Sequence, residues 1–254
     1  MKPIIIVQAR MTSTRLPEKV LREVLNKPLL EYLVERLRRT RLASGIVIAT
    51  TTNDTDVPIV ELCKRLKVQI YRGPEDDVLA RYHGAAREHN ADPVVRVTSD
   101  CPVIDPEIID RVLGVFLENA GQYDYVSNAQ VRSYPRGMDT EVFSFKALHE
   151  AFTESTAQPD REHVTPFIYR RPERYHMANV IFEQDRSRHR WTVDTPEDFD
   201  LIKRIIEALY PVKRDFTLRD MLDLIDRHPD WPLINEHIEQ KKLDKRLYQE
   251  GKND

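Results

Sequence analysis

Ile4-Ile5-Ile6-Val7 is a continuous apolar run, and such runs are typical of strands buried on both faces of a parallel sheet. Three β-rich runs repeat this pattern at similar intervals, at 46–49, 68–71 and 94–97. Segments with helical spacing of apolar residues lie between them. This alternation predicts an α/β fold with an open, mostly parallel sheet, helices on both faces, and ligands bound beyond the carboxyl ends of the strands.

Helix start signals support the same alternation. An apolar stripe at helical spacing over 29–37 follows Pro28, and Pro106 opens a helix after the fourth strand. Two further helices are expected after Asp56 and Asp76, because a carboxylate at that position caps the N-terminus of a helix.

The second half of the chain is less regular. Its expected elements are strands at 123–127 and 177–182, and helices at 143–152, 162–171 and 195–209. Thr195 is placed to cap the last of these helices, and Thr217 with Asp220 resembles a second capping arrangement.

No low-complexity linker or internal repeat divides the chain. Its 254 residues suit one large domain or two small ones. We therefore predict a single domain over 1–254, with an irregular insertion at about 121–190 and a charged tail at about 236–254.

Composition excludes several classes of protein. Lys and Arg number 39 against 42 Asp and Glu, and this balance argues against a nucleic-acid binder, which needs many cationic contacts to phosphate. The apolar runs are much shorter than the roughly 20 residues that span a bilayer. The N-terminus also lacks the long apolar segment of a secretory signal, so we expect a cytoplasmic protein without a membrane partner.

Neither cysteine nor histidine shows a catalytic or metal-binding pattern. Only Cys63 and Cys101 occur, which implies no disulfide framework and fits a reducing compartment. Cys101 lies beside Asp100, but no nucleophile motif surrounds it, and a packed thiol is the stronger interpretation. The eight histidines are scattered without the spacing of a zinc site.

Glycine is scarce, with seven residues in the chain. Neither a dinucleotide-binding G-x-G-x-x-G pattern nor a Walker loop can be assembled from them. If the protein binds a phosphorylated nucleotide, side chains must therefore hold the phosphates.

The segment after the first strand carries the strongest chemical signal: Gln8-Ala9-Arg10-Met11-Thr12-Ser13-Thr14-Arg15-Leu16-Pro17-Glu18-Lys19. It belongs to a strand-to-helix connection of about twenty residues, which is long and therefore points to function. Arg10, Arg15 and Lys19 supply dispersed positive charge with hydroxyl groups between them, as a triphosphate requires. A solvated basic loop is the alternative interpretation.

Two aspartates stand where strands are expected to pass into loops. Asp100 follows the fourth strand, and Asp194 lies in the segment just before Thr195. Two carboxylates, substrate phosphates and water suffice to bind Mg²⁺. Each aspartate could instead form an ordinary turn or helix cap. Asp54 and Asp56 form a D-x-D pattern of the kind that holds metal in many sugar-nucleotide transferases, although helix capping explains it more simply.

A third group of polar residues lies in the irregular second half. Residues 136–142 alternate charged and uncharged side chains, which places Asp139 and Glu141 on one face of an extended chain. These carboxylates could grip the hydroxyl groups of a polar acceptor, and His163 is a further candidate to touch substrate. An edge strand with a polar face toward water is the alternative.

Six motifs together resemble those of the cytidylyltransferase family that includes CMP-sialic acid and CMP-Kdo synthetases, and most closely its spore-coat polysaccharide biosynthesis branch. The resemblance covers most of 3–205. The motifs are Q-A-R-M-T-S-T-R-L-P-E-K at 8–19, R-G-P-E-D-D-V-L-A-R at 72–81, T-S-D-C-P-V-I-D-P at 98–106, P-R-G-M-D-T-E-V at 135–142, R-E-H-V-T-P at 161–166 and W-T-V-D-T-P-E-D at 191–198.

The resemblance implies a Rossmann-like fold that binds CTP and Mg²⁺, commonly as a homodimer joined through the insertion. It assigns the triphosphate to Arg10, Arg15 and Lys19, and the metal to Asp100 and Asp194. The full nucleotide-binding set is Gln8, Ala9, Arg10, Ser13, Arg15, Lys19, Arg72 and Asp77. The acceptor half departs from the sialic-acid synthetases, and its candidate residues are Arg136, Asp139, Glu141 and His163.

We therefore predict a Mg²⁺-dependent enzyme of surface polysaccharide biosynthesis that transfers CMP from CTP to a small polar acceptor, an acidic sugar or a related compound, and releases pyrophosphate. Two alternatives belong to other classes. A glycosyltransferase would hold its metal with Asp54 and Asp56. A non-catalytic nucleotide-binding module would keep Arg10 and Arg15 but release no pyrophosphate.

Overall fold

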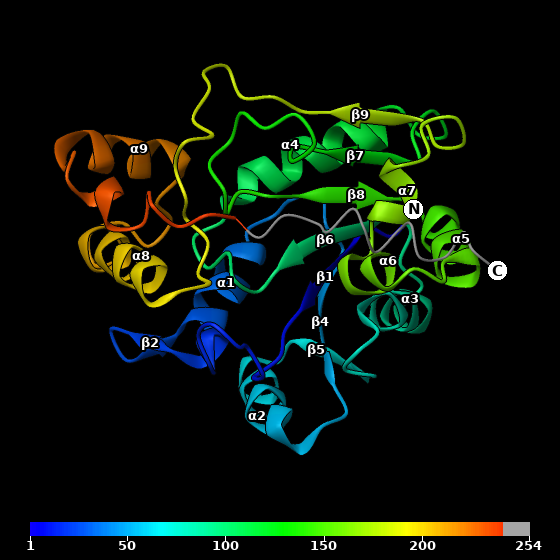
Figure 1. The fold of residues 1–254 in the computed structure, drawn as a ribbon, viewed down its shortest axis with the longest axis horizontal. Helices are drawn as coiled ribbons and strands as arrows, with labels where there is room; N and C mark the ends of the chain where they lie inside the picture. Colours follow the sequence, from blue (N-terminus) through cyan, green and yellow to red (C-terminus); the bar gives the residue numbers. More distant parts are fainter. Residues whose placement is uncertain (241–254) are drawn as a thin grey trace.

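The computed structural model describes residues 1–240, and its centre is a seven-stranded sheet with the strand order β5-β4-β1-β6-β8-β7-β9 (Figure 1). The strands are β1 (Ile4–Gln8), β4 (Gly45–Thr51), β5 (Gln69–Gly73), β6 (Val94–Thr98), β7 (Tyr125–Ser127), β8 (Glu141–Phe143) and β9 (Met177–Asn179). β1, β4, β5 and β6 are parallel, and β8 alone runs against its neighbours β6 and β7. The predicted open and mostly parallel sheet is confirmed.

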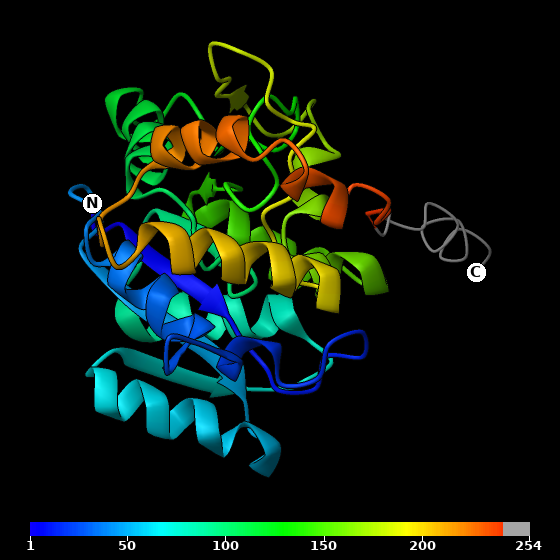
Figure 2. The ribbon, with the colours of Figure 1, turned by 90° about the vertical axis from the view of Figure 1, so that its left-hand side faces the viewer.

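Helices cover both faces of this sheet (Figures 1 and 2). One face carries α1 (Leu29–Leu37), α2 (Val57–Leu66), α4 (Pro106–Glu118), α8 (Pro196–Leu209) and α9 (Leu218–Arg227). The other carries α3 (Val78–His89), α5 (Phe145–Glu154), α6 (Gln158–His163) and α7 (Pro166–Tyr169). Within residues 1–240, none of the helices has the length and apolar character needed to span a bilayer.

The first strand supplies side chains to both hydrophobic cores. Ile5 and Val7 join the core beneath α1 and α4, whereas Ile4 and Ile6 join the core beneath α3 and α5. All four side chains are almost fully buried. Successive side chains from Ile4 to Val7 thus enter opposite cores, and all four positions along the strand are buried. The sequence therefore shows a continuous apolar run here.

Short elements complete the described chain. An antiparallel pair, β2 (Glu23–Val24) and β3 (Lys27–Pro28), lies within the long connection after β1. The 3-10 helices are η1 (Lys19–Leu21), η2 (Asp54–Asp56) and η3 (Trp231–Ile234). Most of the predicted charged tail, residues 241–254, lies outside the described residues.

The expected helix caps are confirmed in two places and wrong in two. Thr195 and Thr217 both form complete capping boxes, with Asp198 and Asp220, and α4 begins at Pro106. The cap of α3 is Asp77 and not Asp76, because the Asp77 carboxylate accepts a hydrogen bond from the Ala80 amide at 2.8 Å. Asp56 precedes α2 without capping it.

Two predicted helices in the second half need correction. The helix expected at 143–152 begins at Phe145, because Phe143 ends β8 and Ser144 is the N-cap. The helix expected at 162–171 is split into α6 and α7, because Val164 has a φ of 73° and Pro166 cannot continue a helix. The alternative of a polar edge strand near residue 141 is also wrong, since β8 lies between β6 and β7.

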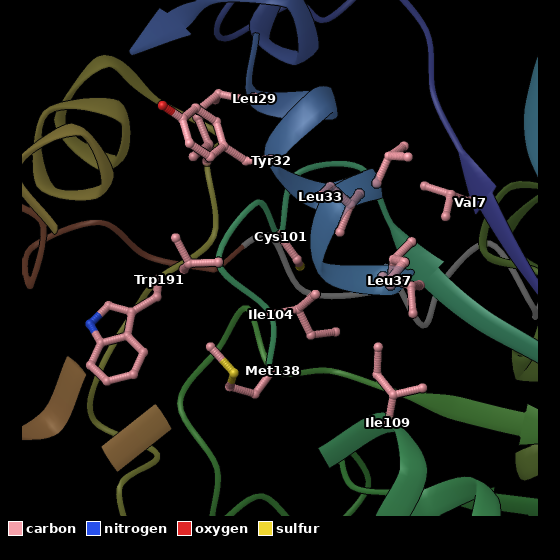
Figure 3. Close-up of a cluster of buried hydrophobic side chains, with 14 of the residues drawn as sticks. Val7, Leu29, Tyr32, Leu33, Leu37, Cys101, Ile104, Ile109, Met138 and Trp191 are labelled. Atoms are coloured by element: carbon pink, nitrogen blue, oxygen red, sulfur yellow. The ribbon is translucent and has the colours of Figure 1, made fainter. Parts of the chain in front are cut away.

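The main core extends to the carboxyl ends of the strands, where the sequence places its candidate aspartates. Figure 3 shows Cys101, Met138 and Trp191 in the same apolar cluster as residues of α1. Cys101 follows Asp100, and Trp191 with the fully buried Val193 precedes Asp194. Both aspartates are therefore anchored on tightly packed backbone.

Candidate active site

Asp56 fixes the loop that follows β1. Its carboxylate accepts hydrogen bonds from the Met11 amide at 2.8 Å and from the Thr50 and Thr51 hydroxyls at 2.9 and 2.6 Å. Burial opposes its charge, but these hydrogen bonds outweigh burial and lower the pKa of Asp56. Both carboxylate oxygens are occupied by groups of the chain, so the D-x-D pattern is a structural anchor and not a metal-binding pair.

Lys19 lies at the centre of the candidate site. Its Nζ is 2.7 Å from Asp194 Oδ1 and 3.6 Å from Asp100 Oδ2. Burial disfavours the ammonium, but Asp100 and Asp194 outweigh it and raise the pKa of Lys19. Burial likewise opposes the charge of Asp100, and Lys19 overcomes it, so that the pKa of Asp100 is lowered. Lys19 and Asp100 are therefore both charged at neutral pH.

A direct backbone contact brings the two aspartates together. The Val193 amide donates to the Asp100 carbonyl at 2.8 Å, and the Thr192 hydroxyl donates to the same carbonyl at 3.3 Å. The loop after β6 and the segment before α8 are thereby joined at one end of the sheet. The site consists of two carboxylates that share a single cation position.

This geometry fits a divalent cation in part. Two carboxylate oxygens point toward one ammonium position, and oxygen ligands are what Mg²⁺ prefers. Among residues 1–240, no cluster of three or more His, Cys, Asp or Glu side chains could enclose a metal. A Mg²⁺ ion held by Asp100 and Asp194 would therefore take its remaining ligands from water and substrate phosphates.

The cations of the loop after β1 separate into two groups. Arg15 joins Lys19, with Nη2 3.0 Å from Asp194 Oδ2. Arg10 lies beside Glu75, with Nη1 3.6 Å from Oε1, and the Thr12 hydroxyl donates to the same carboxylate oxygen at 2.5 Å.

Glu75 is a connecting residue that the sequence reasoning missed. Besides Arg10 and Thr12, it accepts a hydrogen bond from the Asn53 side chain. The buried Arg81 holds its backbone, donating to the Glu75 carbonyl at 2.7 Å. The only available signal was its position inside the motif at 72–81.

The remaining nucleotide-binding candidates make hydrogen bonds, mostly with backbone groups, close to the loop after β1. Arg72 donates to the carbonyls of Thr51 and Asn53 at 2.8 and 3.0 Å, and Asp77 pairs with Arg161 as well as capping α3. Ala9 is buried and bonds through its amide to the Ala49 carbonyl, and the Ser13 amide donates to the Met11 carbonyl.

The structure separates the two carboxylates predicted to share one face in the acceptor half. Glu141 is buried and accepts hydrogen bonds from Tyr125 Oη at 2.6 Å and Thr165 Oγ1 at 2.7 Å, in addition to an ion pair with Arg96. Asp139 pairs with Arg132 at 2.5 Å and is more exposed. The expectation of a common face is wrong, because β8 begins only at Glu141.

A polar chain links this acceptor half to the first strand. Arg96 donates to Gln8 Oε1 at 3.3 Å, and β6 carries Arg96 between β1 and β8. Burial opposes the charge of Arg96, but Glu141 outweighs it and raises the pKa of the guanidinium. His163 ends α6, two residues before Thr165.

Arg136 and Gly137 hold the segment that leads to Asp194. The Arg136 amide donates to the His189 carbonyl at 2.9 Å, and the Trp191 amide donates to the Arg136 carbonyl at 2.8 Å. Gly137 has a φ of 99°, and a Cβ there would lie 2.4 Å from the Trp191 carbonyl oxygen. This close approach requires glycine.

Cys101 does not have the properties of a nucleophile. Its thiol is buried, and burial together with the neighbouring Asp100 raises its pKa. A reactive cysteine needs a thiolate and therefore a lowered pKa. The interpretation as a packed thiol is supported.

Comparison with known proteins identifies the family. A family model described as cytidylyltransferase matches residues 4–246. The chain belongs to the cytidylyltransferase family. This cytidylyltransferase is 36% identical over 243 residues to an uncharacterized protein of Methanocaldococcus jannaschii, covering 95% of this chain and 97% of that protein.

Two further comparisons agree. The cytidylyltransferase is 31% identical over 235 residues to the spore coat polysaccharide biosynthesis protein SpsF of Bacillus subtilis, covering 89% of this chain and 95% of that protein. A solved cytidylyltransferase structure from Leptospira borgpetersenii superposes with a TM-score of 0.88 and 32% identity, covering 95% of this chain and all of that one. These matches support nucleotidyltransferase activity on a Rossmann-like fold.

Proposed function

We propose that this enzyme transfers CMP from CTP to a small polar acceptor, an acidic sugar or a related compound, in a Mg²⁺-dependent reaction that releases pyrophosphate. The observation that carries the proposal is the position of the Lys19 ammonium between Asp100 and Asp194. The name of the SpsF relative favours a role in surface polysaccharide biosynthesis.

The reaction needs positioning and charge stabilisation more than covalent chemistry. A hydroxyl oxygen of the acceptor forms a bond to the α-phosphorus of CTP and gives up its proton to water. The bond from that phosphorus to the bridging oxygen breaks, and pyrophosphate leaves. Arg15 and Lys19 would stabilise the negative charge on the triphosphate and on the leaving group, with the Lys19 ammonium turned from the two aspartates to the phosphates when Mg²⁺ is bound. Asp100 and Asp194 would hold Mg²⁺, which supplies charge neutralisation at the phosphate oxygens when bound.

The acceptor is proposed to bind on the side of the site formed by the second half of the chain. Arg136 would pair with an anionic group, while Asp139 and His163 would contact hydroxyl groups. Glu141 would contribute mainly by shaping this side, because its oxygens already accept from Tyr125 and Thr165.

A pyrophosphate-release screen tests the proposal. The enzyme, Mg²⁺ and each of the four common nucleoside triphosphates would be combined with acidic sugars, sugar phosphates and neutral sugars. The proposal expects release with CTP and an acidic acceptor, and none after EDTA treatment. Tight CTP binding without release across the panel would favour the non-catalytic module. A parallel assay replaces the triphosphate with a nucleotide sugar, and release of free nucleotide there would favour a glycosyltransferase.

A further inference from the structure

A buried arginine, Arg190, contacts Asp194 of the candidate site. The Arg190 guanidinium makes two bonds to Asp198, from Nε to Oδ1 at 2.8 Å and from Nη2 to Oδ2 at 2.9 Å. Its Nη2 also lies 3.3 Å from Asp194 Oδ2. Arg190 and Asp198 are both buried, at 6% and 0% exposed.

The two carboxylate oxygens of Asp194 therefore have different partners. Oδ2 contacts Arg190 and Arg15, whereas Oδ1 contacts Lys19 at 2.7 Å. Arg190 and Arg15 therefore fix the orientation of the carboxylate through Oδ2. Oδ1 is left facing the cation position that Asp194 shares with Asp100. Asp198 also accepts a hydrogen bond from the Asp194 amide at 3.0 Å, which fixes the backbone of the same residue.

The segment after η3 supports Arg190 and Asp198. The buried Asn235 donates through Nδ2 to Asp198 Oδ1 at 2.8 Å and to the Arg190 carbonyl at 2.9 Å. Gln240 Oε1 accepts a hydrogen bond from Arg190 Nη1 at 2.5 Å. Residues 235–240, which belong to none of the six sequence motifs, thus contact the two residues that hold Asp194.

We propose that Arg190, held by Asp198 and Asn235, is a positioning residue that aims Asp194 Oδ1 at the cation position between Asp194 and Asp100. The inference rests on the proposed function, because it assumes that this position takes the metal. Buried ion pairs contribute little net stability compared with apolar packing, so orientation is the better account of this one. Groups that orient metal ligands change metal affinity or activity by about 10–100-fold when they are replaced.

The test measures metal binding directly. Electron paramagnetic resonance would give the Mn²⁺ dissociation constant of the folded protein with saturating α,β-methylene-CTP. Arg190→Lys keeps a positive charge but loses the forked geometry, and we expect it to raise the dissociation constant about 10–100-fold. Asn235→Ala is expected to raise it less, in the same direction, because Arg190 keeps its bonds to Asp198.

Two control variants separate positioning from general destabilisation. Arg36 is a similarly buried arginine that donates to the carbonyls of Ile104 and Phe216 and makes no hydrogen bond or ion pair with Asp100 or Asp194. Arg36→Lys should lower the melting temperature without changing Mn²⁺ affinity. The exposed Arg188→Lys should change neither quantity.

Asp194→Asn separates this inference from the proposed function. If Asp194→Asn loses Mn²⁺ binding while Arg190→Lys and Asn235→Ala bind as tightly as the native protein, the positioning role is refuted and the metal site stands. If Asp194→Asn itself binds Mn²⁺ normally, both the metal site and the positioning role are refuted. Equal loss of affinity in Arg36→Lys and Arg190→Lys would also overturn the inference, because it would indicate a stability effect.

Discussion

The Lys19 ammonium and the Asp194 carboxylate meet at 2.7 Å, although 175 residues separate them in the chain. One comes from the loop after the first strand and the other from the segment before α8. Asp100, on the loop after β6, completes the group. Three connections at the carboxyl ends of parallel strands thus converge on one position, which is where open α/β sheets assemble ligand sites.

Removing the charge of either aspartate should impair activity more than folding. Asp100→Asn and Asp194→Asn keep the side-chain shape, and we expect each to reduce Mg²⁺-dependent pyrophosphate release by at least about 10²-fold, the scale of losing one preorganised charged group. Asp54→Asn, at an exposed position, is the matched control and should keep full activity. Full activity in a folded Asp100→Asn or Asp194→Asn protein would refute the metal-binding role proposed for that aspartate.

The backbone contact at Gly137 gives a prediction for stability. Gly137→Ala puts a Cβ 2.4 Å from the Trp191 carbonyl oxygen at a φ of 99°, so it should destabilise the protein by more than the roughly 1–3 kcal/mol of backbone strain alone. Gly121 has a φ of 84°, and no atom lies within 4 Å of the position that a Cβ would take there, so Gly121→Ala isolates the strain. Urea denaturation of both variants checks this, and equal losses would refute the steric account.

The sequence predicted the sheet well because its inner strands are buried on both faces and therefore read as uninterrupted apolar runs. It also located Thr195 and Thr217, because a capping box depends only on residues three apart. It failed at 162–171, where a helix stops because Val164 adopts a positive φ before Pro166. Such a break depends on packing that local spacing does not reveal.

The grouping of three candidate residues could be predicted, because polar and charged side chains follow the ends of expected strands. Asp100 and Asp194 stand out in the sequence because they adjoin expected strands and helices, and Lys19 stands out because it lies in a long connection whose 8–19 segment carries three cations. The supporting residues, such as Arg190 and Glu75, do not stand out in the sequence. Their roles depend on hydrogen bonds and ion pairs that only the folded chain brings together. Long-range polar pairing leaves no periodic pattern that a single sequence displays.

Buried His189 should make stability depend on pH. Burial lowers its pKa to about 4, whereas an unfolded histidine titrates near 6.5. As pH falls from 6.5 toward 4, the unfolded state binds a proton that the folded state does not, so the free energy of unfolding decreases by up to about 1.4 kcal/mol per pH unit. His189→Phe keeps a ring stacked on Trp191, at 5.3 Å between centroids in the native protein, and should show a shallower decrease.

The exposed His237 provides the control for that measurement. His237→Phe should retain the native dependence of unfolding free energy on pH in urea titrations between pH 7 and 4.5. If His189→Phe and the native protein lose stability in parallel, another group is responsible for the acid sensitivity.

Glu141 and Asp139 should respond differently to substitution. Glu141→Gln leaves the Arg96 charge poorly compensated and should cost about 3 kcal/mol of unfolding free energy, the lower end for breaking a buried pair. Asp139→Asn should cost less than about 1 kcal/mol but raise the KM of the acceptor found in the pyrophosphate screen. An unchanged acceptor KM, or a collapse of CTP affinity, would remove Asp139 from the acceptor side.

The most direct test of the account is a calorimetric titration of CTP with Mg²⁺ into the native protein and into Lys19→Met. The proposed function gives Lys19 a charge-assisted bond to the triphosphate, so we expect its loss to weaken CTP binding by about 10–100-fold. Lys146→Met, at an exposed position, should leave CTP binding unchanged. Native CTP affinity in a folded Lys19→Met protein would contradict the account, because the group between Asp100 and Asp194 would then lie outside the nucleotide site.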